Sequence, residues 1–318
     1  MNRAFLFPGQ GSQAVGMGKA LAEAFAPARE VFQEVDEALS QNLSRLMWEG
    51  PEGDLILTEN AQPAIMAASM AIIRVLQREA GLDFARHARL VAGHSLGEYT
   101  ALCAAGAFTL GDTARLLKIR GRAMQAAVPV GEGSMSALLG ADVALAEEAA
   151  KEAVAQATEA DPVCVVANDN APGQIVISGR KATVERAGEI AKAKGVKRAL
   201  PLAVSAPFHC PLMKPAADAM AEALAAVTIR PLSVPLIANV TATETNEPES
   251  IRRLLVEQVT SRVRWRESVL AFRPAGVEIT VEAGGNKVLT GMVKRIDKDL
   301  ATITLDTAAD IETFARTL

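Results

Sequence analysis

The sequence predicts an α/β protein in which a small subdomain interrupts a larger domain built on a mostly parallel sheet. Short apolar strands alternate with amphipathic helices along most of the chain, which is the pattern of a parallel sheet covered by helices. Over residues 133–203 this alternation changes to a strand, a helix, two strands, a helix and a strand. With 318 residues, the chain is long enough for about two such domains.

The elements of the large domain follow from hydrophobic periodicity. The first expected strand covers residues 4–7, and a second at 89–92 leads directly into a helix at 96–105. The helix at 113–127 has Asp112 before it, and a short polar side chain there is typical of an N-cap. The other expected elements are helices at 28–39, 64–78, 251–259 and 287–296, a helix starting near 211, and strands at 235–238, 277–281 and 301–305.

The inserted subdomain has the order β-α-β-β-α-β, which is the ferredoxin-like arrangement. The segment from Asn168 to Gly173 is rich in turn-forming residues and suits a turn between the two middle strands. We place the large domain at residues 1–132 and 204–318 and the subdomain at 133–203. Within the subdomain, the expected strands are 135–139, 163–167, 174–178 and 198–204, and the expected helices are 143–157 and 181–194.

Composition excludes several classes of protein. Half the residues are apolar and 22% are charged, so the chain is globular rather than disordered. The 33 basic and 37 acidic residues give a net charge of −4, and we expect no binding to nucleic acid or to a membrane. Three cysteines without a C-x-x-C pair predict neither a disulfide framework nor a metal site. No export signal is readable at the N-terminus, and we expect a cytoplasmic protein.

The most informative motif is Gly93-His94-Ser95-Leu96-Gly97, which lies between a predicted strand and a predicted apolar helix. This context is typical of a nucleophile elbow. The glycines allow a sharp turn, and the helix N-terminus offers partial positive charge and the N–H of Leu96 to an oxyanion. We therefore predict an α/β-hydrolase-like large domain with Ser95 as nucleophile; a chance Gly/Ser turn is the alternative.

A serine nucleophile needs a neighbouring base, most often a histidine, and the chain has three histidines. His94 adjoins Ser95, where neighbouring side chains diverge, and His87 lies in a polar stretch before the strand. His209, in a loop after the insert, is the predicted base, with a structural loop residue as the alternative. A long segment still follows His209 and no acidic partner is evident, which disfavours the common esterase order of Ser, acid and late His. A backbone carbonyl is then the expected partner of the imidazole.

Arg120 occupies the apolar face of the helix predicted at 113–127. A guanidinium on such a face needs acceptors, and its planar fork fits bidentate binding of a small carboxylate. An internal ion pair explains the pattern equally well. The residues three and four positions away from Arg120 on this helix are Leu116, Leu117, Ala123 and Met124. The cations expected to face solvent are Arg115, Lys118 and Arg122.

The loop from Gly9 to Ala14 contains G-x-G-x-x-A after the first strand, as a dinucleotide-binding fingerprint would. However, Pro8 intervenes, and no second strand ends in an acidic residue about 20 residues later. We therefore expect no nucleotide cofactor. A glycine-rich loop at a strand end can instead offer backbone N–H groups to an oxyanion.

Together these motifs resemble the malonyl-CoA:acyl carrier protein transacylases of type II fatty-acid synthesis and, more loosely, the acyltransferase domains of fatty-acid and polyketide synthases. The similarity runs nearly end to end. One departure is Gly284-Gly285-Asn286-Lys287, where the family usually has Gly-Pro-Gly-Lys, so we expect a change in loop stiffness there. The similarity is carried by residues 7–13, 93–99, 120–121, 124–125, 172–174, 208–209 and 212–213, and by Gln258 ahead of Trp265.

The resemblance implies transfer of a malonyl group from malonyl-CoA to the phosphopantetheine thiol of holo acyl carrier protein by a monomer, with no metal or cofactor. It implies that an arginine binds the malonyl carboxylate and that a phenylalanine before the catalytic histidine favours malonyl over methylmalonyl. The implied site residues are Ser95 as nucleophile, His209 as base, Gln10 and Leu96 as oxyanion donors, Gln258 as the carbonyl that orients the histidine, and Arg120, Phe208 and His94 in substrate binding.

Two other functions stay open at this point. A serine thioesterase or esterase would use Ser95 and His209 with water as acceptor. A non-catalytic protein that binds acyl carrier protein would not need Ser95. The acidic carrier is expected to dock on the basic helix at 181–194 with Lys197 and Arg198, although an ordinary solvated helix face explains these charges as well.

Overall fold

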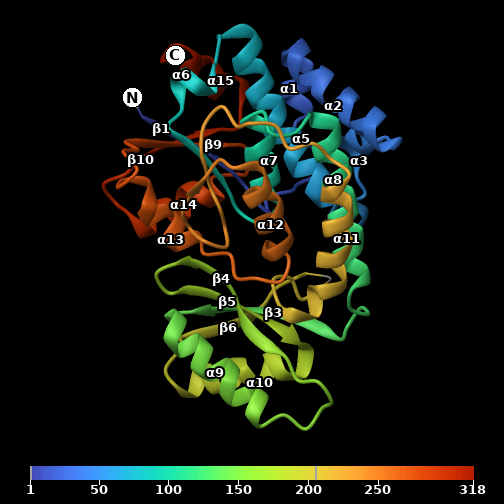
Figure 1. Cartoon of the computed structure of the whole chain (residues 1–318), viewed down its shortest axis with the longest axis vertical. Coiled ribbons are helices and arrows are strands. Elements are labelled where there is room, and N and C mark those ends of the chain that lie inside the picture. Colours follow the sequence, from blue (N-terminus) through green and yellow to red (C-terminus); the bar gives the residue numbers. More distant parts are fainter. Residues whose placement is uncertain (1, 205) are drawn as a thin grey trace.

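The computed structural model describes residues 2–204 and 206–318, so Met1 and Ser205 lie outside the described residues. It contains two sheets, which lie in separate halves of the molecule (Figure 1). A six-stranded sheet has the order β10-β9-β1-β2-β7-β8, and a four-stranded sheet has the order β4-β5-β3-β6. The predicted fold class, an α/β protein with a mostly parallel sheet and a separate small subdomain, is confirmed.

The large sheet is parallel from β10 to β7, and the short β8 pairs antiparallel with β7. β1 lies between β9 and β2, and all five of its residues are buried. A strand covered on both faces is a continuous apolar run, which is why it could be predicted from the sequence. The strands are β1 Arg3–Phe7, β2 Leu90–Gly93, β7 Leu236–Ile237, β8 Glu244–Thr245, β9 Ile279–Ala283 and β10 Ala301–Leu305.

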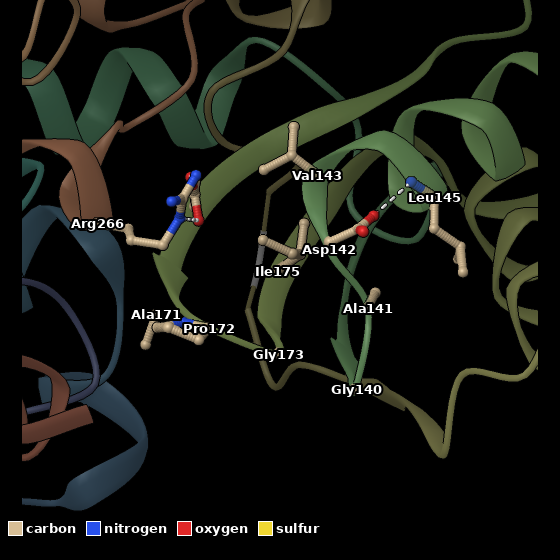
Figure 2. Close-up of a pocket in the computed structure, with 11 residues that line it drawn as sticks. Gly140, Ala141, Asp142, Val143, Leu145, Ala171, Pro172, Gly173, Ile175 and Arg266 are labelled. Atoms are coloured by element: carbon tan, nitrogen blue, oxygen red, sulfur yellow. Dashed lines mark hydrogen bonds and ion pairs between the residues drawn. The ribbon is translucent and has the colours of Figure 1, made fainter. Parts of the chain in front are cut away.

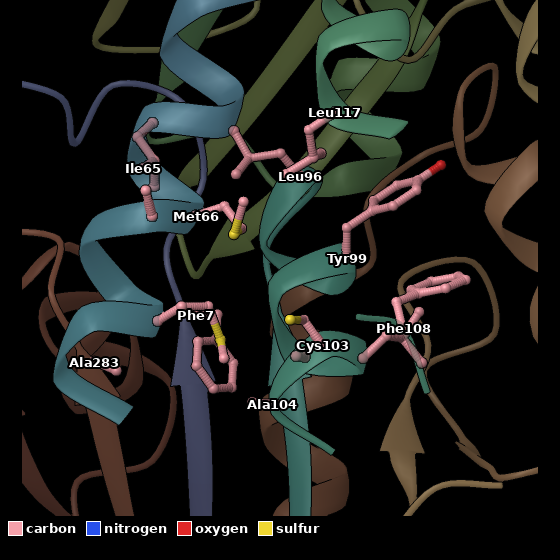
Figure 3. Packing of buried hydrophobic residues seen from close by; sticks show 14 of the residues in the cluster. Phe7, Ile65, Met66, Leu96, Tyr99, Cys103, Ala104, Phe108, Leu117 and Ala283 are labelled. Atoms are coloured by element: carbon pink, nitrogen blue, oxygen red, sulfur yellow. The ribbon is translucent and has the colours of Figure 1, made fainter. Parts of the chain in front are cut away.

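Alternate residues of β1 enter two hydrophobic cores on opposite faces of the large sheet. Phe5 and Phe7 pack in the core formed with α5 and α7, and Figure 3 shows Phe7 between these two helices. Ala4 and Leu6 pack in the core that contains α13.

None of the described helices is long and apolar enough to cross a membrane. The helices around this sheet are α1 Lys19–Ala24, α2 Ala26–Leu39, α3 Leu43–Glu49, α4 Glu52–Leu55, α5 Thr58–Glu79, α6 Phe84–His87, α7 Leu96–Ala104, α8 Leu110–Ala126, η1 Pro211–Met213, α11 Lys214–Ala225, α12 Pro248–Gln258, α13 Trp265–Phe272, α14 Val288–Ile296 and α15 Ala308–Ala315.

The small sheet is antiparallel and follows the predicted order of strand, helix, two strands, helix and strand. The predicted turn is wrong in its first part, because residues 168–171 belong to β4 and the chain turns at Pro172 and Gly173. Register shifts at residues 166–168 and 169–171 allow this polar segment to stay in the strand. The elements are β3 Gly133–Leu139, α9 Val143–Ala155, β4 Cys164–Ala171, β5 Gln174–Arg180, α10 Lys181–Ala193 and β6 Arg198–Pro201.

β4 joins the small sheet to the large part of the molecule. The N–H of Asp169 donates to the carbonyl of Val263 at 3.0 Å, and the N–H of Val263 donates to the carbonyl of Ala167 at 2.8 Å. The buried carboxylate of Asp169 also pairs with Arg266 of α13 at 2.9 Å. These contacts hold β4 against α13 and the residue Val263 just before it, while the domain boundaries given above stay a prediction.

Two expectations for α8 are corrected. The N-cap is Thr109, whose Oγ1 accepts from the N–H of Asp112 at 3.0 Å, so Asp112 lies in the first turn. Thr and Asp both cap helices, and the local pattern did not separate them. Lys118 does not face solvent: it is 9% exposed, and its Nζ donates to the side chains of Gln41 and Asn60.

Candidate active site

β2 and α7 meet at Ser95 in a sharp turn. Ser95 has φ 54° and ψ −111°, which is rare for a residue with a side chain. A Cβ at Gly93 would lie 1.9 Å from the carbonyl oxygen of Gly97, and a Cβ at Gly97 would lie 2.2 Å from that of Phe7. Both positions therefore require glycine. This is the geometry of a nucleophile elbow, with Ser95 at the carboxyl end of β2.

His209 lies against Ser95 although 114 positions separate them in the sequence. Its Nε2 is 2.8 Å from Ser95 Oγ, and its Nδ1 is 2.9 Å from the main-chain carbonyl oxygen of Gln258. The carbonyl can only accept, so Nδ1 carries the hydrogen and Nε2 is free to accept one from the serine. The arrangement is a nucleophile and base held in line by a third group.

The imidazole of His209 is neutral near pH 7. The side chain is 3% exposed, and burial, followed by the positive charge of Arg120, lowers the pKa of His209 to about 3. A neutral imidazole is the form that can take a proton from Ser95.

Arg120 of α8 brings its guanidinium to the nucleophile. The residue is 1% exposed, and its Nη2 donates to Ser95 Oγ at 3.1 Å and to Gln258 Oε1 at 2.8 Å. Its Nη1 donates to Gln62 Oε1 at 2.8 Å. Within the described part of the chain no carboxylate forms an ion pair with it, and burial lowers its pKa. Two neutral amides thus hold a buried cation, and binding of a carboxylate by it stays a prediction.

The two expected oxyanion donors lie in the elbow itself and in the loop that packs against it. Leu96 is the first residue of α7, directly after the nucleophile. Gln10 follows Gly9 in the loop after β1, and a Cβ at Gly9 would lie 2.7 Å from the carbonyl oxygen of His94. This loop therefore packs directly on the elbow, and donation to an oxyanion by the N–H groups of Gln10 and Leu96 stays a prediction. The Gln10 side chain turns to Thr58 Oγ1 at 3.2 Å.

His94 and Phe208 also lie at the site. The Nε2 of His94 is 2.8 Å from Asn170 Oδ1 of β4, and its ring lies 5.7 Å from that of Trp265. His94 thus links the elbow to the small subdomain, and burial lowers its pKa. Phe208 is buried directly before His209. Substrate binding by either residue stays a prediction.

Sequence reasoning gave no role to three polar residues of the site: Gln62, which accepts from Arg120 as described above, Asn239 and Glu98. Asn239, just after β7, accepts from the N–H of Ser95 at 2.8 Å through Oδ1 and donates to the carbonyl of Gly93 at 2.7 Å. Its position after a strand that neighbours β2 is a signal that could have found it, because the carboxyl ends of parallel strands meet at one edge. Glu98 of α7 accepts from Gln258 Nε2 at 2.7 Å, and burial raises its pKa to about 7.

A separate cavity of about 380 Å³ lies beside β4 (Figure 2). It is lined by the β3–α9 loop, the β4–β5 turn and the Asp169–Arg266 ion pair. Ser95, His209 and Arg120 do not line it. Among the described residues, no group of His, Cys, Asp and Glu side chains is arranged to hold a metal ion. The predicted site residues His209 and Arg120 therefore lie at Ser95 and not at this cavity.

The sequence is similar to known transacylases over nearly its whole length. Residues 4–311 match the acyl transferase domain family. A malonyl CoA-acyl carrier protein transacylase from Bacillus subtilis (strain 168) is 46% identical over 317 residues, covering 99% of this chain and 96% of the relative. The protein of the same name from Escherichia coli (strain K12) is 46% identical over 293 residues, covering 92% of each.

Solved structures match over the full chain as well. An acyl-carrier-protein-S-malonyltransferase from Bartonella henselae is 55% identical with a TM-score of 0.96, covering 100% of this chain and 99% of that one. A malonyl-transacylase solved in complex with its type II polyketide synthase acyl-carrier protein, PlMCAT:AntF, is 42% identical with a TM-score of 0.94, covering 100% of both chains.

Proposed function

The chain belongs to the acyltransferase-domain family and, within it, to the malonyl-CoA:acyl carrier protein transacylases, and on this premise we propose how its residues carry out the reaction. The reaction is malonyl transfer from malonyl-CoA to acyl carrier protein, that of an acyl-carrier-protein S-malonyltransferase, EC 2.3.1.39. The observation that carries the proposal is the 3.1 Å contact between Arg120 Nη2 and Ser95 Oγ. It places a cation for a free carboxylate beside a nucleophile for a thioester.

In the first half-reaction, Ser95 Oγ attacks the thioester carbon of malonyl-CoA while His209 Nε2 takes the hydroxyl proton. The N–H groups of Gln10 and Leu96 hold the tetrahedral oxyanion. The carbonyl of Gln258 accepts the Nδ1 hydrogen throughout and keeps the ring in the required tautomer. When the C–S bond breaks, the proton on His209 passes to the sulfur of coenzyme A, and malonyl-Ser95 remains.

In the second half-reaction, the phosphopantetheine thiol of acyl carrier protein enters the vacated position. His209 takes the thiol proton, and the sulfur attacks the ester carbon of malonyl-Ser95. The C–O bond breaks, and Ser95 regains the proton from His209. The two half-reactions form a ping-pong cycle with no cofactor, and water as the acceptor would instead make the protein a thioesterase.

Arg120 selects the acyl group in this proposal. Its guanidinium pairs with the free carboxylate of the malonyl group, because a buried cation held by two amide oxygens gains a strong charge-assisted interaction there. This pairing fixes the acyl chain against Ser95 and orients the ester for the thiol. The family resemblance, in which a phenylalanine before the catalytic histidine accompanies preference for malonyl over methylmalonyl, gives the same proposed role to Phe208. His94 is the third proposed substrate contact.

The carrier protein is proposed to dock near the C-terminal end of α10. Lys192 pairs with Glu189 at 2.7 Å and Lys194 pairs with Glu148 at 2.8 Å, so these charges are partly neutralised within the chain. Lys197 and the first residue of β6, Arg198, are exposed and carry the proposed attraction to an acidic partner.

The cytoplasmic location is supported by the cysteines, all three of which are free thiols, as in a reducing compartment.

The test is the mass of the intact protein after brief exposure to malonyl-CoA, with holo acyl carrier protein added afterwards. A malonyl adduct that is absent from Ser95→Ala and that moves to the carrier supports the transacylase mechanism. An adduct lost to water at the same rate with and without carrier indicates a thioesterase. Carrier binding that is unchanged in Ser95→Ala, with no adduct in the wild type, indicates a non-catalytic binding protein.

A further inference from the structure

A buried carboxylate lies behind the proposed site and takes no part in the mechanism above. Glu98, in the first turn of α7, is 1% exposed. Its Oε2 accepts from Gln258 Nε2 at 2.7 Å and from the main-chain N–H of Asn239 at 3.3 Å. No ion pair compensates it among the described residues. Burial of a carboxylate without a direct counter-ion is costly, so the two hydrogen bonds from Gln258 and Asn239 are what compensates it.

The side-chain amide of Gln258 connects Glu98 to Arg120. The nitrogen of this amide faces three acceptors: Glu98 Oε2, the carbonyl of Ser95 at 3.0 Å and Asn239 Oδ1 at 3.3 Å. Its oxygen faces Arg120 Nη2 at 2.8 Å. The two ends of an amide are similar in size, so these partners alone decide which end meets the arginine. Glu98 makes the shortest of the three contacts, and above its pKa of about 7 it is the only charged acceptor among them.

Reversal of this amide would change the surroundings of Arg120. An NH2 group would then point at the guanidinium, and two donors would face each other. Arg120 would keep Gln62 as its remaining amide acceptor and lose the one that holds Nη2 beside Ser95. Because the guanidinium must lie within hydrogen-bonding distance of a small acyl carboxylate, even a small displacement would weaken that contact.

We propose that Glu98 is a positioning residue for acyl-group selectivity, which holds the Gln258 amide with its oxygen toward Arg120 and thereby keeps Arg120 beside the acyl group. Glu98 itself touches neither the acyl group nor the reacting atoms. The proposal rests on the carboxylate-binding role of Arg120 in the proposed function. Orientation of His209 does not depend on it, since that contact uses the main-chain carbonyl of Gln258.

The experiment compares Glu98→Ala with Glu98→Gln in the rate of Ser95 acylation by malonyl-CoA and by acetyl-CoA, which lacks the free carboxylate. Single-turnover rates are followed by intact mass at about pH 8, above the pKa of about 7 that burial gives Glu98. We expect Glu98→Ala to lower the malonyl-to-acetyl rate ratio by about 10- to 100-fold, the effect of one charge-assisted hydrogen bond. Glu98→Gln should restore the ratio to within about threefold of wild type, because two donors face Oε2 and a carboxamide oxygen can accept from both.

The controls separate failure of this inference from failure of the proposed function. Arg120→Ala must lose the preference for malonyl over acetyl. If it does not, Arg120 is not the residue that binds the malonyl carboxylate, and the proposed function fails at that point. Glu282→Ala removes another buried glutamate, one that accepts from the N–H groups of Leu289 and Thr290, and it should lower stability with the ratio unchanged. An unchanged ratio in folded Glu98→Ala overturns the inference, as does a Glu98→Gln variant that behaves like Glu98→Ala.

A second variant covers the case in which Glu98→Ala does not fold. Gln258→Leu removes the amide that Glu98 orients and keeps the main-chain carbonyl bonded to His209. We expect the same fall in the malonyl-to-acetyl ratio, with the acetyl rate falling less than the malonyl rate. Equal losses of the malonyl and acetyl rates would mean that the Gln258 side-chain amide supports the nucleophile and not selectivity, and would overturn the proposal.

Discussion

The main-chain carbonyl of Gln258 accepts a hydrogen bond from Nδ1 of His209 at 2.9 Å, in the place where many serine enzymes use a carboxylate. This neutral acceptor fixes the tautomer and the ring plane and brings no negative charge beside the base. It explains why no acidic partner could be found for the histidine in the sequence. It leaves Nε2 of His209, 2.8 Å from Ser95 Oγ, available to remove the serine proton.

His209→Ala should therefore slow acylation of Ser95 by about 100- to 10,000-fold, the usual contribution of a positioned general base. The loss should be similar for malonyl-CoA and acetyl-CoA, because the proton comes from the serine in both reactions. Rapid-quench mass measurement gives the two rates. His87→Ala is the matched control and should leave both rates unchanged, because His87 lies before β2 and its ring accepts from the N–H of Asp83. A loss confined to malonyl would contradict the assignment of His209 as base.

Arg120→Ala should lower the malonyl rate by about 10- to 100-fold more than the acetyl rate, since only malonyl loses a charge-assisted hydrogen bond. The measurement is kcat/KM for each thioester. Arg122→Ala on the same helix is the control, because its side chain is 66% exposed and pairs with Glu59 at the surface. Equal losses for both thioesters after the Arg120 change would show that the guanidinium serves attack rather than recognition.

The parts of this site that could be predicted are those set by local sequence. Ser95 lies in a strand-turn-helix motif, and Arg120 stands out because its helix neighbours are apolar. Asn239 and Glu98 could not be predicted in the same way, because their mutual contact joins positions 141 residues apart and depends on how β7 pairs with β2. In the fold, long amphipathic helices were found, whereas short elements such as β8, with two residues, carry too little periodic signal.

Gly97→Ala should destabilise the fold by about 1–3 kcal/mol or more, because the added Cβ would meet the backbone carbonyls of Phe7 and Pro8 at 2.2 and 2.8 Å. Urea unfolding gives the free energy of unfolding. Gly53→Ala is the matched control: it lies in the helix α4, and a Cβ added there would have no atom within 4 Å, so it should be neutral or slightly stabilising. A Gly97→Ala variant as stable as wild type would mean that the elbow relaxes easily.

The last prediction concerns the pH dependence of acylation. The base form of His209 is the neutral imidazole, and burial together with Arg120 lowers the pKa of His209 to about 3 from the usual value near 6.5. A lowered pKa means that the neutral form persists as the pH falls, so the acylation rate should stay nearly constant between about pH 8 and pH 5. The test is the acyl-enzyme burst with acetyl-CoA, measured by intact mass across this range, because acetyl transfer does not need the carboxylate contact that Glu98, with a pKa of about 7, is proposed to support.

Arg120→Ala provides the control for this prediction, because it removes the positive charge that is the second cause of the low pKa. Its acylation rate with acetyl-CoA should begin to fall at a higher pH than that of the wild type, while burial still keeps the midpoint below 6.5. A wild-type rate that halves near pH 6.5 would show that the imidazole is well solvated when the site is working. The contact of His209 with Ser95 would then open to water during the reaction.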